Sequence, residues 1–425
     1  MEHYPNGEPR RRRRRRGAAP WEVGFPLAVF ALHWLLIQLA ATLAYRFGEA
    51  NSPSPPYSRP PAPMGGLAGW IVEPLRQWDG LWYALIAETG YAGSTESAKA
   101  AFWPLFPWLM DGGSRLTGWR PETVGYLVAN ASFAVALVLL LRLVKLDFPD
   151  PVARRTLVAL AFFPTAFFFQ AVYTESLFLL LVVGALLAAR LDRWWIAGLL
   201  GALAALTRSY GVLLALPFAV LLWQAYGADL GRWFPRAFAA GLPALGPLLF
   251  GWHLGQVQGN WRAFIDVQAQ WNRYSALPWE TLRCAVEGCF ALGGEPDGAE
   301  WAWAGQLAAS PGLVADNGWR VAAANSDTLE LVCTLLFLGL AVVGLRVLPA
   351  WQSAYAVPGL LIPLFSPSEV HALMSMPRFG LTLFPLFIVL AVLLRWRPLA
   401  VAALALAATL LLLLTVQFAQ WYWVS

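Results

Sequence analysis

Long apolar runs, separated by short polar turns, occupy most of this chain. The runs lie at about 24–45, 122–144, 156–172, 174–190, 194–207, 209–226, 237–255, 328–346, 352–365, 380–395 and 399–418. A helix needs about 20 apolar residues to cross a bilayer, because hydrocarbon offers no partner for backbone N–H and C=O groups. The pattern therefore predicts an all-α polytopic membrane protein with about 11 transmembrane helices. The runs 194–207 and 352–365 are short, which indicates either clipped boundaries or half-helices that reach a cavity.

The composition agrees with this class. Hydrophobic residues make up 58% of the 425 residues and charged residues only 13%, with a mean hydropathy of +0.54. A soluble multidomain enzyme could not keep so much apolar surface out of water.

A run of seven arginines, Arg10 to Arg16, stands directly before the first apolar run. Such a cluster is typical of a cytoplasmic segment that binds anionic lipid headgroups, so we predict a cytoplasmic basic tail over residues 1–23. The alternative, an arm that binds nucleic acid, is disfavoured by the spans that follow, and we expect no nucleic-acid partner. The run 24–45 has no convincing cleavage site after it, so we interpret it as a signal anchor.

The remaining basic residues support an amino terminus on the cytoplasmic side. The turns that would then be cytoplasmic contain Arg142, Lys145, Arg154, Arg155, Arg190, Arg193, Arg232, Arg236, Arg346, Arg395 and Arg397. This distribution follows the positive-inside rule. Residues 24–425 then form one transmembrane domain with two long outer loops, at about 46–121 and 256–327.

Several ionisable residues fall on the outer side in this threading. They are Asp79, Glu88, Glu175, Arg208, His371 and Arg378. Charged groups at the ends of spans are costly unless they are paired or face water, which favours one polar cavity open to the outer leaflet. The alternative, for Glu175 and the two arginines, is a set of structural ion pairs between helix ends.

Five short motifs, in this order, resemble the PIG-V type of mannosyltransferase and its bacterial relatives. They are Trp78-Asp79 with Gly90-Tyr91, Ala101 to Pro107, Tyr173-Thr174-Glu175-Ser176, Thr207-Arg208-Ser209-Tyr210-Gly211, and Pro377-Arg378-Phe379. The resemblance implies a GT-C membrane fold, a dolichyl or polyprenyl phosphate mannose donor, an active site on the outer face, and Asp79 as catalytic base. It does not define the lipid-linked or glycan acceptor, because the long second loop departs from the family. The Ala-, Leu-, Arg- and Trp-rich composition looks bacterial, so we expect a multi-pass protein of the bacterial plasma membrane.

The residue types suit this chemistry. A prenyl phosphate is a weakly basic leaving group and needs no general acid, so one base and one cation suffice. Asp79 would take the proton of the acceptor hydroxyl in a single inverting displacement. Arg208 or Arg378 would hold the phosphate through charge-assisted hydrogen bonds, and Glu175 would orient an arginine or the sugar.

Other residues are predicted to bind substrate beside this group. These are the motif aromatics Trp78, Tyr91 and Tyr173, together with Glu88, a second candidate base, and His371, which could instead be merely solvated. The candidate metal ligands are few and scattered, so we expect no metal and no other cofactor.

Three questions stay open at the level of sequence. A glycan flippase or transporter, or a non-catalytic scaffold of a glycan-assembly complex, would also have many spans and ionisable residues, although we find no inverted repeat. The segment from Trp261 to Tyr274 has helical spacing and could form either a sugar-binding rim or a surface helix on the bilayer. Cys284 and Cys289 could pair in an oxidising compartment.

Overall fold

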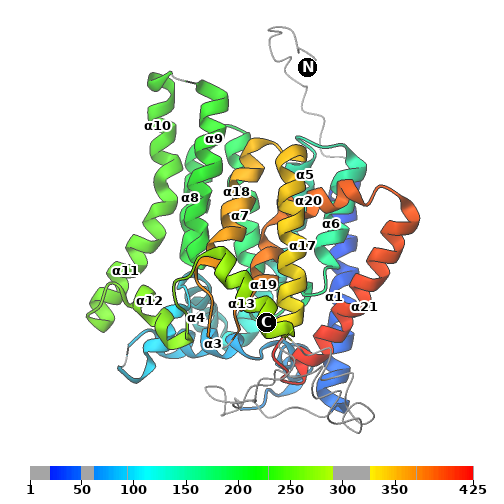
Figure 1. Ribbon diagram of the computed structural model, residues 1–425. Helices are drawn as coiled ribbons and strands as arrows, with labels where there is room; N and C mark the ends of the chain where they lie inside the picture. Colours follow the sequence, from blue (N-terminus) through cyan, green and yellow to red (C-terminus); the bar gives the residue numbers. More distant parts are fainter. Residues whose placement is uncertain are drawn as a thin grey trace.

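The structure is a computed structural model that describes residues 20–48, 62–92, 94–227, 229–290, 326–369 and 371–424. Over these residues the chain is helical, without a strand, and has one isolated bridge, between Arg273 and Ser368. The helices stand side by side in one bundle (Figure 1). The prediction of an all-α polytopic membrane protein is therefore confirmed, while the arginine run of the predicted basic tail lies outside the described residues.

Within the described residues, six helical stretches are long and apolar enough to cross a membrane. They are α1 (Trp21–Phe47), α5 (Pro121–Val144), Ser209–Tyr226 with η4 and α9, Trp233–Gln258 with most of α10, η5 and α11, Asp327–Val347 in α17, and α21 (Arg397–Ala419). The pair α19 (Met376–Thr382) and α20 (Phe384–Leu393), bent by 83°, would make a seventh. The total of eleven spans therefore stays a prediction.

Shorter helices fill the interior of the bundle between these long ones. They are α6 (Asp150–Ala161), α7 (Glu175–Arg190), α8 (Trp194–Thr207) and α18 (Ala350–Leu361) (Figure 1). Helix α8 has the bounds of the predicted short run, and α18 continues as the 3-10 turn η8 (Ile362–Phe365). Both end beside the cavity described below, as expected for half-helices that reach a polar space.

Close packing of small residues brings the interior helices together. A side chain at Gly211 would collide with the backbone of Ala204 and Ala205 on α8, and Gly246 of α11 (Leu245–Gln258) also meets Ala205. Small residues of this kind let transmembrane helices approach closely. The close approach at Gly211 involves neighbouring segments of the chain: directly after Arg208 the backbone folds back against α8.

The two predicted long loops lie at the same end of the bundle, which we call the loop end (Figure 1). The first contains α2 (Gly66–Ile71), η1 (Glu73–Leu75), α3 (Asp79–Thr89), η2 (Ser94–Ala101) and α4 (Leu105–Thr117). The second contains α12 (Ala263–Asp266), η6 (Val267–Trp271) and α13 (Pro278–Phe290). Cys284 of α13 is exposed and not in a disulfide, and the side chain of Cys289 lies outside the described residues.

Helix α8 offers a direct test of which end faces outward. Ser209 follows α8 at the loop end and is exposed, and Leu191 precedes α8 at the opposite end and is exposed as well. In a background without native cysteines, Ser209→Cys should react with an impermeant thiol reagent added to intact cells. Leu191→Cys should react only after the membrane is opened. The reverse pattern would place the loop end in the cytoplasm.

Candidate functional site

A row of ion pairs joins four segments that are far apart in the sequence. The Nη1 group of Arg378 donates to Oδ2 of Asp79 at 2.7 Å, and its Nε donates to Oε1 of Glu175 at 2.9 Å. The same Glu175 oxygen is 2.9 Å from Nη1 of Arg208. Glu175 is fully buried and the arginine side chains nearly so, which makes these pairs part of the interior rather than the surface.

The positions of these residues in their helices explain their placement. Asp79 is the first residue of α3 and Glu175 the first residue of α7. The positive end of a helix dipole favours a carboxylate at this position. Arg208 directly follows α8, and Arg378 lies in the short helix α19. The sequence prediction that Asp79, Glu175, Arg208 and Arg378 meet at one place is thus what the structure describes.

Aromatic rings surround the two arginines. The guanidinium of Arg378 lies 4.8 Å from the ring of Tyr173 and 5.0 Å from the ring of Phe168, and Arg208 lies 5.2 Å from Phe379. Tyr173 also accepts a hydrogen bond from the backbone N–H of Asp79 at 3.1 Å and donates one to the carbonyl of Gln77 at 3.1 Å. Tyr173 therefore contacts both partners of the Asp79 to Arg378 pair from behind.

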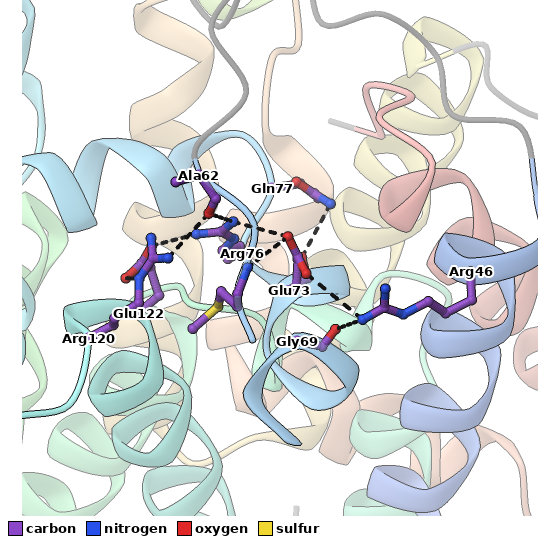
Figure 2. A network of polar contacts seen from close by, with 9 residues as sticks. Arg46, Ala62, Gly69, Glu73, Arg76, Gln77, Arg120 and Glu122 are labelled. Atoms are coloured by element: carbon purple, nitrogen blue, oxygen red, sulfur yellow. Dashed lines mark hydrogen bonds and ion pairs between the residues drawn. The ribbon is translucent and has the colours of Figure 1, made fainter. Parts of the chain in front are cut away.

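A second buried network anchors the chain before Asp79 (Figure 2). Arg76, at the centre, donates to Glu122 of α5 at 2.6 Å, to Glu73 at 3.3 Å and to the carbonyl of Ala62 at 2.9 Å. Arg120 binds Glu122 from the other side at 2.7 Å. These contacts tie the loop to the beginning of α5, so that α3 starts from a fixed point.

Trp78 does not line the cavity described below but supports the backbone at Asp79. Its backbone has a φ of 55°, which is uncommon for a bulky residue and needs support from its surroundings. Its ring packs against Trp421 and Trp423, with centroid distances of 5.7 and 5.2 Å. The end of the chain thereby holds the turn on which α3 begins.

A cavity of about 220 Å³ lies in front of the ion pairs. Its described charged lining residues are Asp79, Arg208, Arg273 and Arg378, and its described aromatic lining residues are Tyr83, Phe102, Trp103, Tyr210, Trp271, Phe379 and Trp423. Burial and the negative charges of Asp79 and Glu175 raise the pKa of Tyr83, so its hydroxyl stays protonated and can donate to a bound molecule. The cavity combines charges for an anion with rings for an apolar or sugar face.

Arg273 is the main cavity residue that the sequence motifs did not identify. Its guanidinium donates to the carbonyls of Ser366 at 2.7 Å and Met374 at 3.4 Å. Burial lowers its pKa, and among the described residues no carboxylate lies within ion-pair distance of it. Gln268 and Trp271 of the same segment also line the cavity, which favours the rim over the surface helix for the stretch from Trp261 to Tyr274.

Three other predicted residues lie outside the cavity wall. Glu88 is exposed on the far turn of α3. Tyr91 is buried, donates to the carbonyl of Phe102 at 2.7 Å, and so shapes the wall only indirectly. His371 lies 3.0 Å from Asp327 through its Nδ1 atom. Glu88 and His371 are therefore not among the described residues that line this cavity.

Comparison with known proteins agrees with the sequence motifs. The family model described as Mannosyltransferase (PIG-V) matches residues 24–231, which include Asp79, Glu175 and Arg208, and it confirms the family resemblance over that part of the chain. Among curated proteins, no sequence matches significantly.

Two solved structures resemble the fold. ArnT from Cupriavidus metallidurans bound to undecaprenyl phosphate has a TM-score of 0.48 and 15% identity, over 92% of this chain and 63% of that one. The apo state of the same protein has a TM-score of 0.48 and 12% identity, over 90% and 62%. The chain thus spans less than two thirds of the length of these structures.

The buried network around Arg76 should matter for stability. Arg76→Met leaves Glu73 and Glu122 buried with fewer partners, a change that costs about 3–5 kcal/mol when a buried ion pair loses one member. We expect a lower midpoint of thermal unfolding in detergent. Arg115→Met breaks only the exposed pair with Asp111 and serves as the matched control. Equal midpoints for the two variants would show that the network does not hold the loop.

Proposed function

We propose that this chain, a multi-pass membrane glycosyltransferase similar to the PIG-V mannosyltransferases, moves a mannosyl unit from a polyprenyl phosphate to a hydroxyl group of a lipid-linked or glycan acceptor. The reaction takes place at the outer face of a bacterial plasma membrane. One observation carries the proposal: the Asp79 carboxylate lines a cavity that three arginines also line, and one of them, the buried Arg378, binds and orients it.

The charge balance of the site supports a lipid phosphodiester as donor. Asp79 and Glu175 contribute two negative charges, and Arg208, Arg273 and Arg378 contribute three positive ones. The two carboxylates account for Arg208 and Arg378, whereas Arg273 forms no ion pair among the described residues and is subject only to the more distant charge of Glu330. A sugar linked to a prenyl phosphate carries one negative charge on its phosphodiester, and this matches the excess. Arg273 and Arg208 therefore bind the phosphate, and Arg378 mainly orients Asp79.

The reaction follows from this arrangement. The acceptor oxygen attacks the anomeric carbon, its proton passes to the Asp79 carboxylate, and the bond between the anomeric carbon and the phosphate oxygen breaks. The electron pair of that bond leaves with the prenyl phosphate, whose second negative charge develops beside Arg208 and Arg273. Because attack and departure occur on opposite sides of the carbon, the configuration inverts. No general acid is required, since phosphate is a weakly basic leaving group.

The aromatic residues of the cavity provide a binding surface for the sugar. Rings such as Trp271, Phe102 and Trp423 offer apolar faces to the carbon side of a hexose, while Tyr83 and Gln268 supply hydrogen-bonding groups. A flippase or a non-catalytic scaffold would bind a prenyl phosphate in the same cavity, but it would have no use for a carboxylate fixed beside the phosphate arginines. The choice of mannose rests on the family resemblance.

Asp79 can be tested by removing only its ability to accept a proton. Asp79→Asn keeps the size of the side chain, and Arg378 keeps its bond to Glu175, so the protein should fold and bind donor. Sugar transfer should fall by about 10²–10⁴-fold, the usual contribution of a positioned base. The measurement is transfer of radiolabelled mannose from polyprenyl phosphate mannose in nanodiscs, together with donor binding.

The control for this variant is Glu88→Gln, which changes an exposed carboxylate on the same helix. It should leave the rate unchanged. Normal turnover by Asp79→Asn would contradict its role as base. No transfer in the wild type with any hexose donor would instead support a flippase or scaffold.

Arg273 provides a second test, directed at the donor. Arg273→Ala removes a charge-assisted hydrogen bond worth about 1.5–3 kcal/mol, so the KM for the donor should rise roughly ten- to a hundredfold. The KM for the acceptor should change little, and Arg273→Lys should restore part of the loss because it keeps the charge. Arg262→Ala, an exposed arginine of the same segment, is the control. An unchanged donor KM in Arg273→Ala would exclude this arginine from phosphate binding.

A further inference from the structure

Three potential metal ligands meet beside the cavity without being part of its wall. Asp327 lies in the first turn of α17 (Ser326–Val347), Glu330 lies three residues further along the helix, and His371 lies in the loop before α19. One ligand atom from each residue lies within 4.8 Å of the others, and Nδ1 of His371 is 3.0 Å from Oδ1 of Asp327. Residues three apart share one face of a helix, which is why the two acids point to the same place.

One oxygen atom of Glu330 is buried without a hydrogen-bond partner among the described residues. Its side chain is fully buried. Its Oε1 atom accepts the backbone N–H of Ser375 at 3.1 Å, whereas the buried Oε2 atom has no hydrogen-bond partner. Among the described residues, no lysine or arginine forms an ion pair with Glu330 or Asp327. A buried carboxylate oxygen without a partner is costly, which favours a bound cation at this place.

We propose that Asp327, Glu330 and His371 bind a divalent first-row cation such as Zn²⁺ or Mn²⁺. The set of one imidazole nitrogen and two carboxylates suits these ions, while Mg²⁺ and Ca²⁺ prefer oxygen ligands alone. A divalent charge balances the two carboxylates, and water completes the coordination.

The geometry gives this cation a positioning role. The loop that contains His371 continues into Met374 and Ser375, both of which line the cavity, and then into Arg378. Ser375 has a φ of 69° and bonds to Glu330, so its backbone depends on this acid. The cation would tie α17 to the segment that carries Arg378, without touching the reacting atoms.

The test measures bound metal directly and does not depend on transferase activity. The full chain, purified without a histidine tag, is stripped with chelator, incubated with Zn²⁺ or Mn²⁺, separated from free metal by gel filtration, and analysed by mass spectrometry for metal content. We expect about one ion per wild-type chain and a rise in the thermal unfolding midpoint on metal addition.

The variants Glu330→Gln and His371→Ala should lose both the bound ion and the midpoint shift. Glu369→Gln alters an exposed acid in the same loop and should keep both. Because a misfolded variant would also bind no metal, each variant is first shown to be monodisperse. Asp327→Asn removes the third proposed ligand and should also lose the bound ion. Absence of metal from the wild type, or equal metal content in wild type and variants, would overturn the proposal. A wild-type protein that binds the metal but transfers no sugar would count against the proposed function and not against the metal site.

Discussion

A guanidinium inside an apolar bundle needs carboxylate or carbonyl oxygens as partners, and this constraint determines how the loop end is built. Arg378 needs both Asp79 and Glu175, and Glu175 in turn compensates Arg208. Leaving any one of these charges buried without its partner would cost more free energy than the loss of most single contacts in the fold. The start of α3, the start of α7, the turn after α8 and the helix α19 must therefore converge, and the cavity forms where they do.

The same physical rule operates a second time around Arg76, but there the charges hold a loop. The two networks differ in access: Asp79, Arg208 and Arg378 border a cavity, whereas Arg76, Glu73 and Glu122 are enclosed. Access to a bound molecule, rather than the pairing of charges, distinguishes the groups suited to chemistry from those that keep the backbone in place. Glu175 is an ion-pair partner of Arg208 and Arg378 and lies directly behind the cavity wall that these arginines line.

Hydropathy predicted the helices well, as the match of 194–207 with α8 shows, because each span must satisfy its own backbone bonds. It also predicted which helix ends share a side of the membrane, and so the meeting of Asp79 with Arg378 across 299 residues. It could not predict the direction in which a side chain points, which is why Glu88, on an exposed turn of α3, does not line the cavity. The spacing from Trp261 to Tyr274 fitted either a rim or a surface helix, so it did not identify Arg273 as a phosphate ligand, and the loop around Arg76 gave no pattern that predicts its partners.

The packing of Trp421 and Trp423 against Trp78 has a consequence for biosynthesis. The turn before Asp79 is synthesised early, yet the two rings that support it belong to a segment that follows it far later in the sequence. Arg378 likewise arrives after most helices have been inserted. Until then Glu175 has Arg208 as a partner, but both Glu175 and Asp79 lack the guanidinium of Arg378. The described arrangement of the cavity can therefore be completed only after α19 and the segment around Trp421 have been synthesised.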